Sequence, residues 1–198
     1  MPKRTLDQVR ETRETVLRRS ADVASVNGLD GLSFSQIASE VGLSKSGLAG
    51  YFESKTDWQL AVIRYARSVF RESVIDIGRE NSNVNTPLIV STCRAWLDYL
   101  ELPVFPGGCF FAAAAAEFDD REGAVRDAVR DTYAQLRNYI AALAGRDADE
   151  KCAGEQMAFE LIAVMIYLNQ SLRIGDDHHA GSMARRSISR IIGQPVDE

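Results

Sequence analysis

The stretch from Ser33 to Lys55 constrains this chain more than any other, and it reads SFSQIASEVGLSKSGLAGYFESK. Ser33 and Gln36 have the Ser-x-x-Gln spacing of a capping box, in which two side chains satisfy backbone N–H groups at a helix start. Gly42 follows a short apolar face, and glycine readily adopts the left-handed conformation that ends a helix. Ser44 is suited to cap a second helix. Two short helices joined by a glycine turn are therefore predicted.

This arrangement is typical of the helix-turn-helix, whose second helix enters the major groove of DNA. Any αα-hairpin in a helical protein can show the same capped helices and glycine, so the pattern alone leaves both interpretations open. On the DNA interpretation, residues 44–47 form the leading end of the second helix, where small side chains let the backbone approach DNA. The candidate DNA contacts are Ser33, Ser35, Gln36, Ser44, Lys45, Ser46, Gly47, Gly50, Tyr51 and Lys55.

The same stretch resembles the DNA-binding domain of the tetracycline-repressor-like (TetR) family of bacterial regulators. Spacing and residue types agree together at Gly28, Leu32, Ser33, Ile37, Ala38, Val41, Gly42, Leu43, Ser44, Lys45, Leu48, Tyr51, Phe52, Lys55 and Leu60. The chain departs from the family at Ala49, because members usually carry an aromatic residue three positions before the final phenylalanine. Gly50 follows it. One common DNA contact is therefore missing, and base recognition is expected to depend on Lys45, Ser46 and Tyr51.

The charge distribution agrees with a small DNA-contacting surface. The net charge is −5, with 23 basic and 28 acidic side chains. Residues 1–55 hold eight basic and seven acidic side chains, which leaves 15 basic and 21 acidic for the remainder. Positive charge is thus weakly concentrated at the N-terminal end, where Lys3 and Arg4 form a short basic arm. We expect a few phosphate contacts and no broad basic surface.

Membrane insertion, metal binding and catalysis are not expected. The chain has no apolar run of about 18 residues and no apolar core of a signal peptide near its start, which predicts a cytoplasmic protein. Cys93, Cys109 and Cys152 lack C-x-x-C spacing and are expected to be thiols. His178 and His179 are a weak metal hint without a third ligand, and we interpret them as part of a turn. No nucleophile elbow, P-loop or dinucleotide motif occurs, so neither an enzyme nor a cofactor is expected.

Helical periodicity extends through the whole chain. Thr5 and Gln8 form a second capping-box pattern, which opens a helix predicted to end at Gly28. Further apolar stripes at 3.6-residue spacing follow, and no strand patterns appear. We predict an all-α fold of about nine helices, in which residues 1–55 form a three-helix DNA-binding domain. Residues 56–198 are predicted to form a helical-bundle effector and dimerisation domain.

The helices near the C-terminus are candidates for a dimer interface. Residues 157–168 read MAFELIAVMIYL and contain a single charged side chain, Glu160. A helix that is apolar on nearly every side must be buried all round. Both this helix and the next, around 153–174 and 180–192, could be ordinary core. We favour a four-helix bundle formed with a second copy across a two-fold axis.

Aromatic and sulfur-containing residues in the larger domain are candidates for an effector pocket. Such residues are often plain core, but bundle interiors also hold ligands. The residues from Gly107 to the acidic end of the next helix resemble the effector domain of one subset of the TetR family, whose C-terminal domains typically hold an inducer. The candidates are Trp96, Tyr99, Phe105, Cys109, Phe110, Phe111, Tyr133, Met157 and Met165. A small apolar or aromatic effector is expected.

The functional hypothesis is a ligand-responsive transcriptional regulator, a repressor, that binds a palindromic DNA operator as a homodimer. The resemblance implies that its effector releases the DNA. The departure at Ala49 and the weak positive charge keep an alternative open. In that alternative the chain is a helical small-molecule-binding protein without specific DNA binding.

Overall fold

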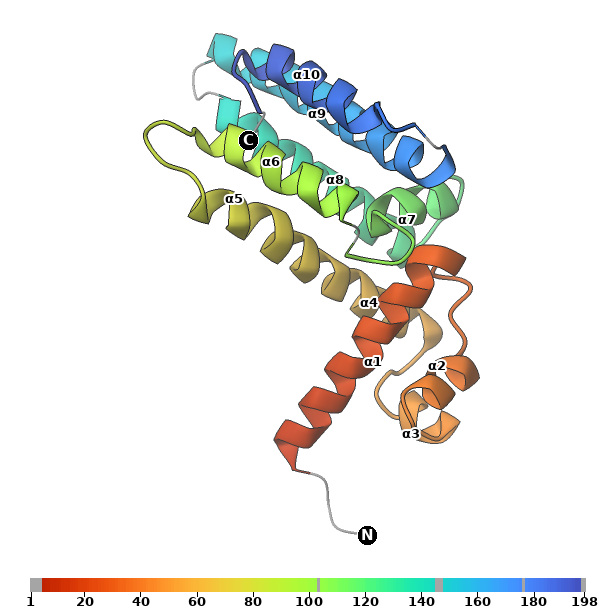
Figure 1. Cartoon of the computed structure of the whole chain (residues 1–198). Coiled ribbons are helices and arrows are strands. Elements are labelled where there is room, and N and C mark those ends of the chain that lie inside the picture. The colour runs from red at the N-terminus through yellow and green to blue at the C-terminus, as the bar shows by residue number, and fades with distance from the viewer. Residues whose placement is uncertain (1–4, 103, 145–147, 176, 197–198) are drawn as a thin grey trace. The chain divides into compact units, whose positions relative to one another are not determined.

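The computed structural model of the chain describes residues 5–102, 104–144, 148–175 and 177–196, with the side chains of residues 148–152 excepted. Throughout these residues the regular structure is helical, apart from an isolated bridge between Asn83 and Thr86 in a loop (Figure 1). The predicted basic arm, Lys3 and Arg4, lies outside the described residues. The all-α prediction is confirmed.

The first helix begins and ends as its sequence predicts. Helix α1 spans Leu6–Asn27, and its capping box is complete because the Thr5 hydroxyl accepts from the Gln8 N–H while the Gln8 side chain accepts from the Thr5 N–H. The helix ends at Gly28, whose φ of 79° lies in the region that glycine adopts without strain. The two short helices that follow are α2, Phe34–Glu40, and α3, Lys45–Ala49.

A long helix follows, and it changes character along its length. Helix α4 (Lys55–Phe70), the π-helical segment η1 (Arg71–Asp76) and α5 (Ile77–Glu80) succeed one another without a break. The remaining helices are α6 (Leu88–Glu101), α7 (Phe110–Phe118), α8 (Ala124–Ala144), α9 (Ala148–Ile174) and α10 (Ala180–Ile192). When the continuous run from α4 to α5 is taken as one helix, the described residues form nine helices, as predicted.

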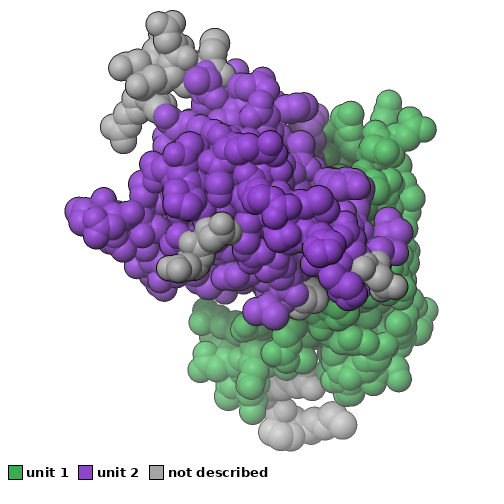
Figure 2. All heavy atoms as spheres, turned by 45° about the horizontal axis from the view of Figure 1, so that its top comes forward, with its two compact units in different colours: residues 1–67, 105–129 green, residues 68–104, 130–198 purple. Residues whose placement is uncertain are grey.

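The chain packs into two compact units that are each discontinuous in sequence. Unit 1 comprises residues 1–67 and 105–129, and unit 2 comprises residues 68–104 and 130–198 (Figure 2). Helix α7 therefore packs with α1 in unit 1. These units group residues by packing and do not test the predicted functional boundary at residue 55, which stays a prediction.

Each unit has its own apolar core. In unit 1, Val16, Ile37, Leu48 and Trp58 are all fully buried between the N-terminal helices. In unit 2, α6 contacts η1, α5, α9 and α10, and α9 runs along α10 (Figure 1). Cys93 of α6 lies in this second core, and burial raises the pKa of its thiol to about 12. A thiol with this pKa is not a nucleophile at neutral pH.

Candidate nucleic-acid interface

The turn between α2 and α3 is built by the backbone of one glycine. Gly42 has a φ of 70°, which non-glycine residues rarely adopt. Its N–H donates to the Ser39 carbonyl at 3.4 Å, and the Leu43 N–H donates to the Ala38 carbonyl at 2.8 Å. This pair of bonds is the Schellman motif that satisfies the last carbonyls of a helix. The predicted helix end at Gly42 is confirmed, and the direction of α3 follows from it.

The start of α3 is capped by Ser44 and anchored by Leu48. The Ser44 hydroxyl accepts from the Gly47 N–H at 3.0 Å. A side chain at Gly47 would place its Cβ 2.9 Å from that hydroxyl, so glycine fits this cap best. Leu48 is fully buried, whereas Lys45 and Ser46 are exposed. The helix thus turns its apolar side to the core and its small polar side to solvent.

The start of α2 differs from its prediction. Ser33 occupies the N-cap position, but its side chain forms no capping hydrogen bond. The Gln36 side chain donates instead to the Glu40 carboxylate at 3.1 Å, and Glu40 also forms an ion pair with Arg19 of α1. These interactions hold the pKa of Glu40 below its usual value, with the hydrogen bond from Arg19 as the largest cause. The predicted Ser33–Gln36 capping box is therefore wrong, because Gln36 turns along the helix toward Glu40.

Trp58 of α4 packs against residues of α1, of α2 and of the segment after α3. Its ring is fully buried, with centroid separations of 4.4 Å from Phe34 and 5.8 Å from Phe52. Its indole N–H donates to the Ser20 hydroxyl at 3.1 Å, and that hydroxyl donates to the Val16 carbonyl at 2.6 Å. A buried polar network with every group paired is rigid. The exposed residues of α2 and α3 therefore lie on a rigidly packed core.

All ten predicted DNA contacts belong to unit 1. Nine of them are exposed, and Tyr51, which follows α3, is half-buried. Gly50 has an ordinary helical backbone, and a Cβ added there would meet only normal contacts at 3.6 Å. No contact among the described residues requires glycine at this position. The Lys55 ammonium donates to the Asp30 carbonyl at 2.6 Å and keeps two further N–H groups for a phosphate.

The predicted effector residues fall into both units. Unit 1 contains Phe105, Cys109, Phe110 and Phe111, whereas unit 2 contains Trp96, Tyr99, Tyr133, Met157 and Met165. Phe105 and Phe110 are buried with their ring centroids 5.8 Å apart, and the rings of Phe110 and Phe111 are 5.3 Å apart. The residues of unit 1 therefore form an aromatic cluster of their own. Within one unit the structure brings together only part of the predicted set.

The interior of unit 2 contains buried polar atoms for which the described residues provide no hydrogen-bond partner. The rings of Trp96 and Tyr99 both meet the Phe70 ring edge-on, at 5.6 and 5.3 Å. Among the described residues, no hydrogen-bond partner exists for the Trp96 N–H, the Thr92 hydroxyl or the Tyr139 hydroxyl. Such buried groups normally have a partner, which can be a water or a ligand. Thr92 and Tyr139 are not among the predicted effector residues, although Thr92 lies one helical turn before Trp96.

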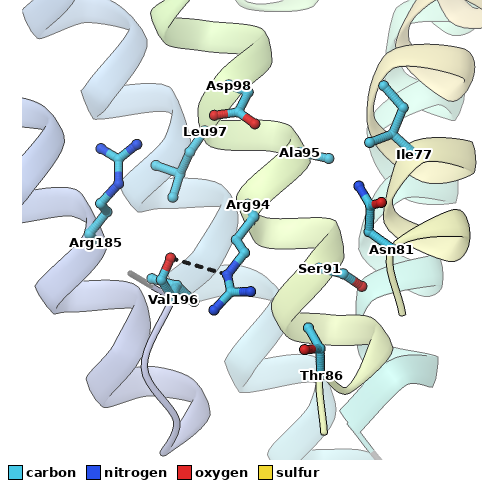
Figure 3. A pocket seen from close by; sticks show the side chains of 10 residues that line it. All are labelled: Ile77, Asn81, Thr86, Ser91, Arg94, Ala95, Leu97, Asp98, Arg185 and Val196. Carbon is cyan, nitrogen blue, oxygen red and sulfur yellow. Dashed lines mark hydrogen bonds between the residues drawn. The ribbon is translucent and has the colours of Figure 1, made fainter. Parts of the chain in front are cut away.

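A separate polar pocket of about 390 Å³ lies in unit 2 (Figure 3). Its lining comes from α5, the loop between α5 and α6, α6, α10 and the segment after α10: Ile77, Asn81, Thr86, Ser91, Arg94, Ala95, Leu97, Asp98, Arg185 and Val196. The Arg94 side chain donates to the Val196 carbonyl at 3.4 Å, and Arg185 forms two bonds to Glu101 at 2.5 and 2.7 Å. None of the predicted effector residues lines this pocket.

Comparisons with known proteins agree with this geometry. Residues 16–61 match the profile "Bacterial regulatory proteins, tetR family", and residues 87–188 match the profile "Tetracyclin repressor-like, C-terminal domain". The second match alone covers more than half of the 198 residues. A comparison with curated protein sequences gave no match.

Several solved structures share the fold over nearly the whole chain. A TetR transcriptional regulator from Chloroflexus aurantiacus is 26% identical with a TM-score of 0.78, covering 95% of this chain and 96% of that one. A TetR-family regulator from Streptomyces coelicolor is 19% identical with a TM-score of 0.78, covering 95% and 97%. AibR, solved with isovaleryl coenzyme A and operator DNA, is 15% identical with a TM-score of 0.63, covering 88% and 97%.

Proposed function

The chain belongs to the TetR family of bacterial transcriptional regulators, and on that premise we propose that it is a homodimeric repressor controlled by a small effector. This family is non-enzymatic. The observation that carries the proposal is the exposed leading end of α3, where Lys45, Ser46 and Gly47 stand on the buried Leu48. Its small polar residues suit close approach to the edges of bases in the major groove.

The proposed DNA contacts divide by chemistry. Lys45, at the first position of α3, is suited to reach a guanine or a phosphate, and Ser46 and Tyr51 can donate or accept hydrogen bonds. Lys55 lies at the first position of α4, where its ammonium and the adjacent helix amides suit a phosphate. Phosphate contacts position the protein, and base contacts specify the sequence.

An apolar surface on α9 and α10 supports dimerisation. Phe159, Tyr167 and Met183 expose 67%, 70% and 44% of their surface, and large apolar side chains exposed together often mark a site of association. Contrary to the expectation from sequence, the helix over residues 153–174 is long and apolar enough, by length and composition alone, to span a membrane. Only 22% of its most apolar stretch of 18 residues is buried within one chain. Association with α9 and α10 of a second copy would cover this surface. Paired α3 helices would then read half-sites about 34–36 Å apart.

The dimer can be tested by introducing charge on this surface. Phe159→Glu and Tyr167→Glu are expected to convert the dimer into a monomer and to weaken operator binding, because a buried carboxylate without a partner opposes association. Sedimentation velocity at several protein concentrations measures the change. Val84→Glu is the matched control, since Val84 is 99% exposed in a loop. A dimer that tolerates both charges would contradict this interface.

The partnerless polar atoms inside unit 2 support an effector of a particular kind. The Trp96 N–H is a donor only, so its natural partner is an acceptor such as a carbonyl or ether oxygen. The surrounding aromatic rings suit an apolar or flat body. AibR, which shares the fold, was solved with a ligand and operator DNA together. We infer an apolar effector that carries at least one hydrogen-bond acceptor.

Release of DNA requires a difference in affinity. An effector shifts the protein toward the DNA-incompetent state only if it binds that state more tightly than the competent one. A regulator of this kind acts on chromosomal DNA and is therefore proposed to be cytoplasmic. Its partners are the operator, the effector and a second copy of the chain.

Selection from a pool of random DNA duplexes tests the function. The purified full-length protein is incubated with the pool at moderate salt, and the retained duplexes are sequenced. We expect an inverted repeat whose half-sites are centred about one helical turn, or a multiple of it, apart. Retention that ignores sequence, or no retention, would instead favour the alternative of a helical ligand-binding protein without specific DNA binding.

A further inference from the structure

The loop between α1 and α2 is held by a carboxylate that comes from much later in the chain. The backbone N–H groups of Leu29 and Asp30 donate to the two oxygens of Glu117, at 2.6 and 2.8 Å. Glu117 lies in the last turn of α7, within unit 1. Hydrogen bonds to an ionised acceptor are about twice as strong as neutral ones. One side chain of α7 therefore fixes two consecutive amides of this loop.

Two glycines make room for this approach. Gly28 has a positive φ, and a Cβ at that position would lie only 2.8 Å from the Glu117 carboxylate. Gly107 donates its N–H to the Ser25 hydroxyl at 2.9 Å, and a Cβ there would overlap the Ser25 carbonyl at 1.8 Å. The segment around α7 thus meets the end of α1 with no space for a side chain between them.

The same loop, residues 28–30, also forms hydrogen bonds with side chains at the start of α4. The Asp30 carbonyl accepts from the Lys55 ammonium at 2.6 Å. The Gln59 side chain donates to the Leu29 carbonyl at 3.1 Å and to the Asp30 carboxylate at 3.0 Å. Lys55 is the proposed phosphate contact, so a continuous series of hydrogen bonds joins Glu117 to a residue that is proposed to touch DNA.

A second ion pair closes the same junction. Arg121, just after α7, pairs with the Asp30 carboxylate, and this contact is the largest cause that holds the pKa of Asp30 below its usual value. The Arg121 guanidinium also lies over the Phe118 ring, 4.7 Å from its centroid. The N–H groups of residues 29 and 30 therefore bond to α7, and their carbonyls bond to side chains of α4. The Asp30 side chain adds the ion pair with Arg121.

We propose that Glu117 is a positioning residue for DNA binding, which acts by holding the loop at residues 28–30 and, through Asp30, the side chain of Lys55. The DNA-reading part of the molecule then includes residues 105–121 as well as the helix-turn-helix. This inference rests on the proposed function, because it concerns the same DNA surface. It adds a residue that has no place in the sequence pattern of a helix-turn-helix.

The test is Glu117→Gln in the full-length protein. Glutamine keeps the shape of the side chain but turns one of the two acceptors into a donor, so one loop amide loses its partner. We expect about tenfold weaker operator binding, because the loop loses one of its two charge-assisted hydrogen bonds to α7. Fluorescence anisotropy with the selected operator measures this. Glu122→Gln is the matched control, since Glu122 is exposed and loses the same charge.

A double-mutant cycle with Lys55→Ala separates positioning from a general loss of structure. If Glu117 acts through Lys55, then Glu117→Gln should have little effect on affinity in the Lys55→Ala background. The slope of log affinity against log salt should also fall by about one in each single variant and no further in the double variant. Full additivity of the two losses, or unchanged affinity in Glu117→Gln, would overturn the proposal.

Two observations keep this test distinct from a test of the proposed function. Failure of the unsubstituted protein to select an operator would refute the function. Normal selection combined with an unaffected Glu117→Gln variant would refute only the positioning role. Hydrogen exchange provides a readout without DNA, since the amides of Leu29 and Asp30 should exchange faster in Glu117→Gln than in Glu122→Gln. Equal exchange rates would also overturn the proposal.

Discussion

The two tryptophans of the chain show how differently its two compact units are built. Trp58 in unit 1 is fully buried, and its indole N–H donates to the Ser20 hydroxyl at 3.1 Å. Trp96 in unit 2 is 4% exposed, yet its indole N–H has no partner among the described residues. A buried donor without a partner costs about 1–3 kcal/mol. The tryptophan of unit 1 is paired and does not carry this cost, whereas the tryptophan of unit 2 does.

The neighbouring polar groups follow the same division. Ser20, Ser25 and Gln59 are buried in unit 1, and each forms hydrogen bonds that complete a local network. Thr92 and Tyr139 in unit 2 keep buried hydroxyls without partners in the described part of the chain. A satisfied network fixes one arrangement, whereas unsatisfied groups favour the binding of a molecule that pairs them. The difference fits the proposal that unit 1 binds DNA on a rigid core and that unit 2 binds the effector.

The largest effect is expected from the core of the reading unit. Leu48→Ala should lower the free energy of unfolding by about 2–5 kcal/mol, because it leaves a cavity beneath α3. Urea denaturation at a fixed protein concentration measures this change. Leu6→Ala removes the same atoms from a side chain that is 79% exposed, and it should stay within about 0.5 kcal/mol. Equal losses in the two variants would contradict the rigid packing of unit 1.

The next largest effect is a loss of operator affinity that is expected at the surface of unit 1 and not at that of unit 2. Lys45→Ala should weaken operator binding by about 1–3 kcal/mol if the ammonium reaches a base. Arg137→Ala on α8 removes the same charge from an exposed position of unit 2 and should leave binding nearly unchanged. Anisotropy titrations with operator and with unrelated DNA distinguish the cases. A loss in Lys45→Ala that is equal on both DNAs would make Lys45 a phosphate contact.

A smaller effect compares the tryptophans directly. Trp58→Phe and Trp96→Phe remove the same atoms, but only the first breaks a hydrogen bond. We expect Trp58→Phe to cost at least about 1 kcal/mol more in unfolding free energy than Trp96→Phe, because the first loses a hydrogen bond and the second removes an unpaired buried donor. Equal costs would mean that the Trp96 N–H has a partner, such as a bound water.

The smallest change in stability is expected at Gly50. Its backbone is helical and a Cβ fits there, so Gly50→Ala should leave stability unchanged or raise it by about 0.4–1 kcal/mol. Thermal unfolding measures this, with Gly42→Ala as the contrasting variant, since its φ of 70° should make alanine unfavourable. If Gly50→Ala nevertheless weakens operator binding, the glycine serves close approach to DNA. Unchanged binding would remove Gly50 from the proposed contacts.

Local patterns predicted most of the fold because they depend on neighbours in sequence. The capping box at Thr5 and the glycine turn at Gly42 formed as expected, since each needs only residues within one helical turn. The box at Ser33 failed because Gln36 found a partner in Glu40, which also pairs with Arg19 of another helix. The pattern could not reveal that competition between helices.

Contacts between distant parts of the chain were beyond the sequence patterns. The clasp of Glu117 on Leu29 joins residues that are 88 positions apart, and no periodicity links them. The predicted effector residues are aromatic and apolar, as a pocket requires, but this property is shared by the aromatic core of unit 1. Which polar atoms remain unpaired, such as those of Thr92 and Tyr139, depends on the packing of several helices at once.

The hydrogen bonds from Leu29 and Asp30 to Glu117 limit how early the N-terminal residues can finish folding during synthesis. Residues 1–67 emerge from the ribosome first, but their loop amides find their acceptor only after Glu117 has been synthesised. At about 5–20 residues per second, this leaves an interval of several seconds. During that interval the N–H groups of Leu29 and Asp30 lack the carboxylate that they bond to in the complete chain. A fragment that ends at the helix-turn-helix is therefore expected to be less ordered than the same residues in the complete chain.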